Sequence, residues 1–265
     1  MIISQFPARR GGTEEYLSLF DYSGSYAVVG DTEEEQQLRF LSSGTLKLHA
    51  GIEADLFLVG GGGGGGSSGH GQYVGRVESK EVYTSYNGGG GGGGYTLTAR
   101  DVELPAGVYT VTVGEGGQTS PYSLDGGASS FIGNSISYTA QGGKTAQRER
   151  NYPIRGGDGG SGGGGGSQSF TEPNIYAGAR GGAGGQDGAY GQGDLPGAGQ
   201  GRTTRAFEEE DGELFASGGS GTETNAQAAG ANTGNGGSCG VYTEAGIVHG
   251  QAGGSGIVIL RLAKE

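Results

Sequence analysis

The sequence has little of what ordinary globular enzymes are built from. Of its 265 residues only 32% are hydrophobic, one is Met and none is Trp. Glycine stands where helix formers such as Ala and Leu would be expected. Long helices, and with them a helical or α/β enzyme fold, are therefore excluded. Only 6 residues are Pro, and Gly does not recur at every third place over any long stretch, which excludes a collagen rod.

Positive charge and cysteine are also scarce. The chain carries 16 Lys and Arg against 28 Asp and Glu, a net charge of −12, which opposes binding to nucleic acid or to an anionic membrane. The single cysteine, Cys239, excludes an internal disulfide framework and a cysteine-cluster metal site. No apolar run approaches the about 18 residues of a membrane-spanning helix. The start of the chain, with Arg9 and Arg10 after a few apolar residues, is not a classical signal peptide.

Short strands account for most of the hydrophobic residues. Two of them, 26–29 and 37–41, flank an acidic turn and predict a hairpin. In the segment that follows, alternation puts Leu46 and Leu48 on the inner face. Segment 55–59 is apolar on both faces, which predicts an interior strand.

Further strands are predicted later in the chain. In segment 108–113, alternation places Tyr109, Val111 and Val113 on one face. In segment 136–140 it places Ile136, Tyr138 and Ala140 on one face. After Gly142 the strand signal nearly vanishes for more than a hundred residues, and it returns at Ile257–Leu262. Exposed, such a strand would promote aggregation. We therefore expect it to complete a sheet formed by upstream strands.

Glycine makes up 66 of the residues, and two uninterrupted runs of seven stand out, Gly60–Gly66 and Gly88–Gly94. In 156–166 the glycines recur in a three-residue register that leaves Asp158 and Ser161 in the third column, and the register recurs over 182–191. A left-handed extended helix with three residues per turn produces this pattern. Because such a helix has no internal hydrogen bonds, the tracts must support one another side by side.

These observations predict an all-β fold that combines an antiparallel β-sandwich with a bundle of polyglycine II helices and almost no α-helix. We expect a leader or attachment segment at 1–19 and one glycine-rich domain at 20–265. Within the domain, the sandwich strands are expected at about 20–60, 95–140 and 256–263, and the bundle at 60–94 and 142–255.

The order of these segments resembles the glycine-rich domain of bacteriophage and prophage tail proteins. The resemblance rests on 55–59 running into Gly60–Gly66, then on 104–114, 127–131 and 254–261. The stretch 201–208, with 214–216 before Gly218 and Gly219, is similar to prophage members in gut bacteria. A related domain of the anaplastic lymphoma kinase receptor family pairs a β-sandwich with a bundle of polyglycine helices.

This resemblance implies a tail-tip or fibre-tip adhesin on a virion tail or a bacterial cell surface. Its partner would be a bacterial cell-surface glycan or protein, with other tail proteins bound through the N-terminal segment. The chain lacks the extended stalk or coiled coil of a long fibre protein, so it would be a tip module or a free accessory protein. A structural or assembly protein is the alternative, and an ice-binding protein is a third possibility without a regular Thr array to support it.

No motif predicts catalysis, a metal or a cofactor. Gly142–Thr145 mimics the end of a phosphate-binding loop, but the first glycine of that motif would fall at Tyr138 and no long helix follows. The three histidines, His49, His70 and His249, have no acid or cysteine partner at metal-ligand spacing. We therefore expect a non-enzymatic protein.

Aromatic residues that interrupt the glycine tracts are the candidate binding residues. Tyrosine offers a large contact area at a small entropy cost, and loops on a rigid scaffold are common recognition elements. The alternative for each residue is a plug that packs against the edge of the bundle. The candidates are Tyr83, Tyr86, Tyr152, Phe170, Tyr176, Tyr190 and Phe207.

Overall fold

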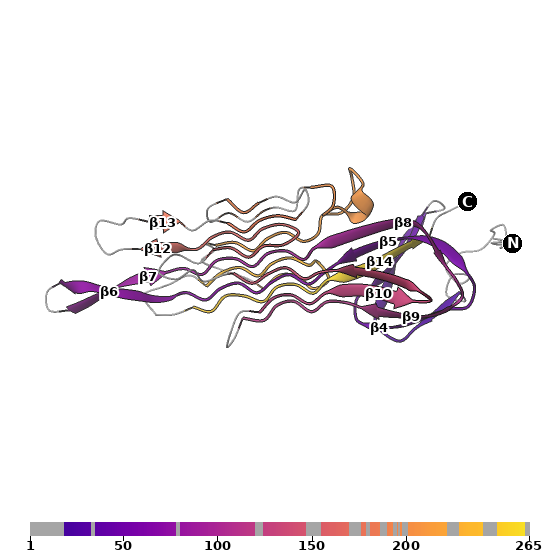
Figure 1. The fold of residues 1–265 in the computed structure, drawn as a ribbon, viewed down its shortest axis with the longest axis horizontal. Coiled ribbons are helices and arrows are strands. Elements are labelled where there is room, and N and C mark those ends of the chain that lie inside the picture. The colour runs from indigo at the N-terminus through magenta and orange to yellow at the C-terminus, as the bar shows by residue number, and fades with distance from the viewer. Residues whose placement is uncertain are drawn as a thin grey trace.

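The computed structural model describes residues 19–32, 35–77, 80–119, 124–146, 155–169, 176–178, 181–185, 190–192, 195, 197, 201–221, 228–240 and 248–262. The molecule is elongated (Figure 1), with two five-stranded sheets at one end, a smaller four-stranded sheet at the other, and glycine-rich tracts running between them along the long axis. Every strand pair is antiparallel, and the described residues contain no α-helix, only a single 3-10 turn, η1 (Ala206–Glu208). The all-β fold class predicted from the sequence is confirmed.

The two large sheets form the sandwich. Sheet A has the strand order β1 (Phe20–Tyr22), β4 (Gly44–Leu48), β9 (Gly107–Thr112), β10 (Ser129–Gly133) and β11 (Ile136–Ala140). Sheet B has the order β2 (Tyr26–Thr32), β3 (Glu35–Phe40), β14 (Ile257–Leu262), β5 (Ile52–Val59) and β8 (Thr96–Leu104). The distal sheet, at the other end, has the order β13 (Tyr176–Gly178), β12 (Ser167–Ser169), β7 (Lys80–Tyr86) and β6 (Gly69–Val77).

Alternating side chains close the space between sheets A and B, as expected from the sequence. Leu46 and Leu48 of β4 are buried, and so are Tyr109 and Val111 of β9. The ring of Tyr109 stacks on that of Phe131, with 5.1 Å between the centroids. The predicted hairpin is β2 and β3, which pair from Tyr26–Phe40 onward.

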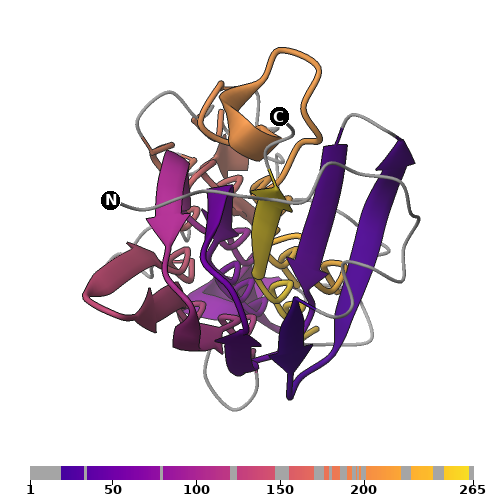
Figure 2. The same cartoon turned by 90° about the vertical axis from the view of Figure 1, so that its right-hand side faces the viewer.

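The C-terminal strand lies in the middle of sheet B (Figure 2), and it pairs with upstream strands, as the sequence analysis predicted. Strand β14 pairs with β3 on one side and with β5 on the other. Val258 and Leu260 enter the core between the sheets, whereas Ile257 and Ile259 enter a second core on the outer face of sheet B. An apolar run without alternation is needed here because both faces of the strand are buried.

The second core is covered by residues 201–216, which we name the strap. Phe207, Phe215 and Ala216 of the strap pack with Phe57 and Val59 on the outer face of β5. The strap residues Phe207, Glu208 and Ala216 all have a positive φ. The strap thus buries the outer face of β5 and β14 in sheet B, whereas several side chains on the outer face of sheet A, among them Val108 and Ile132, are exposed.

The glycine tracts are held by hydrogen bonds to their neighbours. The seven N–H groups of Gly60–Gly66 donate in strict rotation to three neighbouring segments: Gly60, Gly63 and Gly66 to 89–95, Gly61 and Gly64 to 124–127, and Gly62 and Gly65 to 251–254. The donor–acceptor distances are 2.8–2.9 Å. Successive N–H groups thus donate to different segments, and every third N–H group donates to the same segment. An extended helix with three residues per turn produces this pattern, and we interpret the tracts as helices of this kind.

The carbonyls of the same tract accept from three further segments. Gly117, Gly143 and Gly237 donate to Gly62, Gly61 and Gly63 respectively, so the tract has six neighbours. Gly88–Gly94 is also surrounded: it donates to 234–240, 161–164 and 144, and accepts from 60–66, 157–160 and 219. These two adjacent tracts form the centre of the bundle.

Close approach of backbones explains why both central tracts consist of glycine alone. A Cβ on Gly62 would lie 1.9 Å from the carbonyl oxygen of Asn235, and one on Gly91 would lie 2.0 Å from that of Gly63. Outer tracts keep side chains on the side without a neighbour. Gln141 and Lys144, three residues apart, are exposed while Gly142 and Gly143 between them are buried.

Two details differ from the sequence analysis. The register at 156–166 predicted one straight helix, but Gly163 donates to the carbonyl of Gly157 at 2.9 Å. A straight extended helix would separate these residues by about 19 Å, so the chain reverses between them. Gly191 likewise donates to Gly182 at 3.0 Å. The second difference lies between the two runs of seven glycines, where β6 and β7 form a hairpin in place of further bundle.

Candidate functional site

The distal sheet is the candidate site, because it combines two segments far apart in the sequence. Strands β6 and β7 leave the two central tracts, and β12 and β13 are added at the side of β7 (Figure 1). Tyr86 pairs with Gln168 and Ser85 with Ser169, which places 80–86 beside 167–169. The sheet therefore closes the end of the bundle opposite the sandwich.

The pairing register collects tyrosine positions in this sheet. Tyr83 is paired with Tyr73 across β6 and β7, and Tyr176 with Ser169 across β12 and β13. Since residues paired directly across strands share a face, and residues two apart on a strand do too, positions 73, 83 and 176 fall on one face. Tyr83 and Tyr176 were predicted as loop residues, and the structure places both on strands.

Tyr73 was missed by the sequence analysis. Its segment lies between two glycine runs, and the composition assigned the whole of 60–94 to the bundle. The available signal was the local density of β-formers in 72–77 and 81–86, where Tyr and Val recur on both sides of a short gap.

Tyr86 has a structural role in the same sheet. It is paired with Gly69, and a Cβ on Gly69 would lie 2.5 Å from the hydroxyl oxygen of Tyr86. The tyrosine side chain therefore lies across the strand neighbour that has no side chain of its own. Tyr86 is half-buried, so it matches the plug alternative better than an exposed binding residue.

The remaining candidates lie elsewhere. Tyr190 is 66% exposed and precedes Gly191, whose N–H bonds to Gly182 on the flank of the bundle. Phe207 is fully buried in the second core, 5.8 Å from the ring of Phe57. It was wrong to group Phe207 with exposed binding residues. Tyr152 and Phe170 lie outside the described residues.

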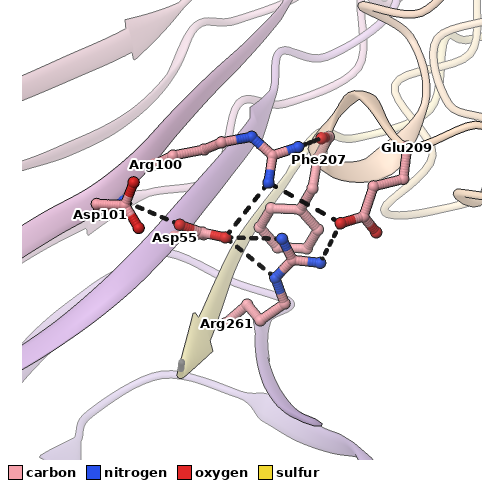
Figure 3. A network of polar contacts seen from close by, with 6 residues as sticks. All are labelled: Asp55, Arg100, Asp101, Phe207, Glu209 and Arg261. Atoms are coloured by element: carbon pink, nitrogen blue, oxygen red, sulfur yellow. Dashed lines mark hydrogen bonds and ion pairs between the residues drawn. The ribbon is translucent and has the colours of Figure 1, made fainter. Parts of the chain in front are cut away.

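A network of charged side chains at the sandwich end contacts Phe207 (Figure 3). Arg261 donates to Asp55 at 2.7 Å and to Glu209 of the strap at 2.7 Å, and its guanidinium lies 4.0 Å from the centroid of the Phe207 ring. Arg100 donates to the carbonyl of Phe207 and lies 3.6 Å from Asp55. The side chains of Arg261 and Asp55 are only 11% and 14% exposed.

This network is built by a bulge in sheet B. The register between β5 and β8 shifts between Ala54 and Leu56, and Asp101 adopts a φ of 52°. The N–H of Asp101 then donates to Asp55 at 2.9 Å. The charges thus satisfy one another and fasten the strap to sheet B, so we assign the network a structural role.

The other residues considered for chemistry do not converge. The described residues contain no group of three or more His, Cys, Asp or Glu that could hold a metal. His49 lies 3.1 Å from Asp21 on sheet A, and His249 lies 3.2 Å from Ser67. Cys239 is fully buried, with its N–H bonded to the carbonyl of Ser220. No helix within the described part of the chain is long and apolar enough to cross a membrane.

A known family model matches most of the chain. Residues 41–263 match the family model described as a glycine-rich domain. The chain therefore belongs to this glycine-rich domain family, and the match extends from the end of β3 to the end of β14. No curated protein matches the chain at a significant level.

Proposed function

We propose that the protein is a non-enzymatic binding module that presents the distal sheet to a bacterial cell surface. The observation that carries the proposal is the gathering of tyrosine positions 73, 83 and 176 on one face of a sheet. The sheet lies at the far end of an elongated molecule (Figure 1). Tyrosine-rich faces on rigid scaffolds suit glycan and protein recognition.

The resemblance to tail proteins of phages and prophages supports the choice of partner. Under this proposal the chain acts at a virion tail or at a bacterial surface, with a cell-surface glycan or protein as its ligand. The net charge of −12 makes nucleic acid an unsuitable ligand.

The experiment compares tyrosines at two places in the molecule. We expect the double substitution Tyr83→Ser with Tyr176→Ser to weaken binding to susceptible bacteria and to a glycan array at least tenfold, with an unchanged circular dichroism spectrum. Tyr190→Ser is the matched control, because Tyr190 is exposed on the flank of the bundle; it should bind as the parent does.

Two outcomes contradict the proposal. Loss of binding in Tyr190→Ser alone would move the site to the bundle flank. If the parent binds neither bacteria nor any glycan, the alternative function, a rigid spacer or assembly protein, is favoured. The observation that favours this alternative is the bundle itself, whose central tracts are hydrogen-bonded to neighbouring tracts and offer no side chain to a ligand.

A further inference from the structure

The two central glycine tracts connect the distal hairpin directly to the middle of the sandwich. Strand β5 ends at Val59 and continues into Gly60–Gly66, which leads to β6. Strand β7 leads into Gly88–Gly94, which continues into β8. Strands β5 and β8 are paired neighbours, with Val59 opposite Thr96. The hairpin is thus joined to sheet B by two tracts that are themselves adjacent.

The hydrogen bonds of these tracts lie across the long axis of the molecule. An extended helix with three residues per turn has no internal hydrogen bonds, and the tracts run along the axis (Figure 1). A pull along the axis therefore shears all the lateral bonds of a tract at once. A pull across the axis, applied to an outer tract, opens them one after another, and each break needs far less force.

The tracts can also lengthen only slightly before their backbone is fully extended. An extended helix of this type rises about 3.1 Å per residue, against a limit of about 3.3–3.6 Å for a fully extended chain. An α-helix, with about 1.5 Å per residue, would roughly double in length before resisting. Tension on the hairpin is therefore transmitted to sheet B with almost no extension of the tracts.

From this geometry we propose that the glycine bundle has a mechanical function: it carries tension between the distal hairpin and sheet B through Gly60–Gly66 and Gly88–Gly94. The inference rests on the proposed function only for the origin of the tension, a cell surface held at the distal sheet. The strap adds support at the sandwich end, since it covers the outer face of β5 and β14 where the load arrives. β14 itself is hydrogen-bonded to β3 and β5 over its length.

Single-molecule force spectroscopy on the folded full chain tests the proposal without any ligand. The axial variant carries Arg76→Cys in β6 and Val28→Cys in β2, the edge strand of sheet B, both exposed positions. The lateral variant carries Tyr190→Cys and Leu124→Cys, two exposed residues in different outer segments of the bundle. The buried Cys239 is replaced by Ser in both. We expect at least a twofold higher unfolding force for the axial pull at the same loading rate, with little extension before rupture.

An axial force equal to or below the lateral force would overturn the proposal, as would a gradual axial lengthening before rupture. Because both pulls use the same folded protein, neither result depends on a substitution in a tract. The outcome is also independent of the binding assays: a protein that binds nothing can pass this test, and a protein that binds well can fail it.

Discussion

The sandwich and the glycine bundle are two opposite solutions to the same packing problem. In the sandwich, large side chains such as Tyr109, Phe40 and Phe131 fill the space between the sheets and are fully buried. In the bundle the backbones themselves are in contact, and the N–H groups of the central tracts donate hydrogen bonds of 2.7–3.0 Å to neighbouring segments. The two regions should therefore respond in opposite ways to a change of side-chain size.

The largest effect is expected from removing β14, the strand that links the two regions. Deletion of Ile257–Leu262 should unfold the protein, because each buried aliphatic side chain contributes about 1.5–3 kcal/mol to a total stability of about 5–15 kcal/mol. Thermal unfolding followed by circular dichroism provides the measurement. A chain ending after Leu262 is the control, and an unchanged melting temperature in the deletion variant would refute the prediction.

The next largest loss of stability is expected from adding one methyl group in the centre of the bundle. Gly91→Ala places a Cβ 2.0 Å from a backbone oxygen, and we expect a loss of at least about 3 kcal/mol, the upper part of the range for overpacked cores. Gly51→Ala is the control, since its Cβ would be 3.7 Å from the nearest atom. Urea unfolding gives both free energies, and hydrogen exchange shows whether the glycine amides lose protection. Equal stability of the two variants would contradict the close packing.

In the sandwich, removing a large side chain should lower the free energy of unfolding, whereas in the bundle adding a small one should do so. Phe57→Ala removes a fully buried ring from the second core and should lower the free energy of unfolding by about 3–5 kcal/mol. Val108→Ala, at a 55% exposed position, should change it by less than about 0.5 kcal/mol. If Phe57→Ala were as mild as Val108→Ala in urea unfolding, the strap could not be packed on sheet B as described.

A smaller effect is expected from the charges that fasten the strap. Glu209→Gln removes one of the two ionic partners of Arg261 and should cost about 1 kcal/mol, because Glu209 is 39% exposed and solvent weakens the pair. Glu210→Gln, on an exposed neighbour, should cost nothing. The difference should shrink as salt is added. A salt-independent difference would mean that the network acts through packing alone.

The last prediction concerns alkaline pH. Burial raises the pKa of Tyr22 to about 12, and its hydroxyl donates to the carbonyl of Ser42. Since the folded-state pKa is above the unfolded value of about 10, this contribution to stability is complete below pH 10 and is lost as the pH rises toward 12. Tyr22→Phe should have a flatter decline in melting temperature between pH 9.5 and 11. A parallel decline in both proteins would assign the loss to other groups.

The sandwich was predictable from the sequence because its signals are local. Alternation identified the inner faces of β4 and β9, and the segment 55–59, apolar on both faces, identified an interior strand. That the partners of β14 lie upstream followed from the lack of any strand near it in the sequence. Each of these arguments uses side chains, and the sandwich core consists of side chains.

Only the general arrangement of the bundle was predictable, because its interior consists of glycine and has no pattern of side chains from which to infer the path of the chain. The runs at 60–66 and 88–94 indicated tracts surrounded by others, but the three-residue registers at 156–166 and 182–191 concealed reversals of the chain. A reversal between glycines leaves no mark in the sequence, since glycine adopts turn and extended conformations alike. Phe207 was misplaced for another reason: four acidic residues, Glu208–Asp211, separate it in the sequence from the apolar partners, Phe215 and Ala216, that bury it.

The rotation of hydrogen-bond partners in the central tracts restricts how this molecule can vary in length. Inserting one glycine would turn the rest of a tract by a third of a revolution, so that every N–H would meet the wrong neighbour. Inserting three restores each partner and, repeated in all the tracts, lengthens the bundle by about 9 Å. Natural insertions and deletions in these tracts should therefore come in multiples of three residues, so that the reach of the distal sheet beyond the sandwich changes in fixed steps.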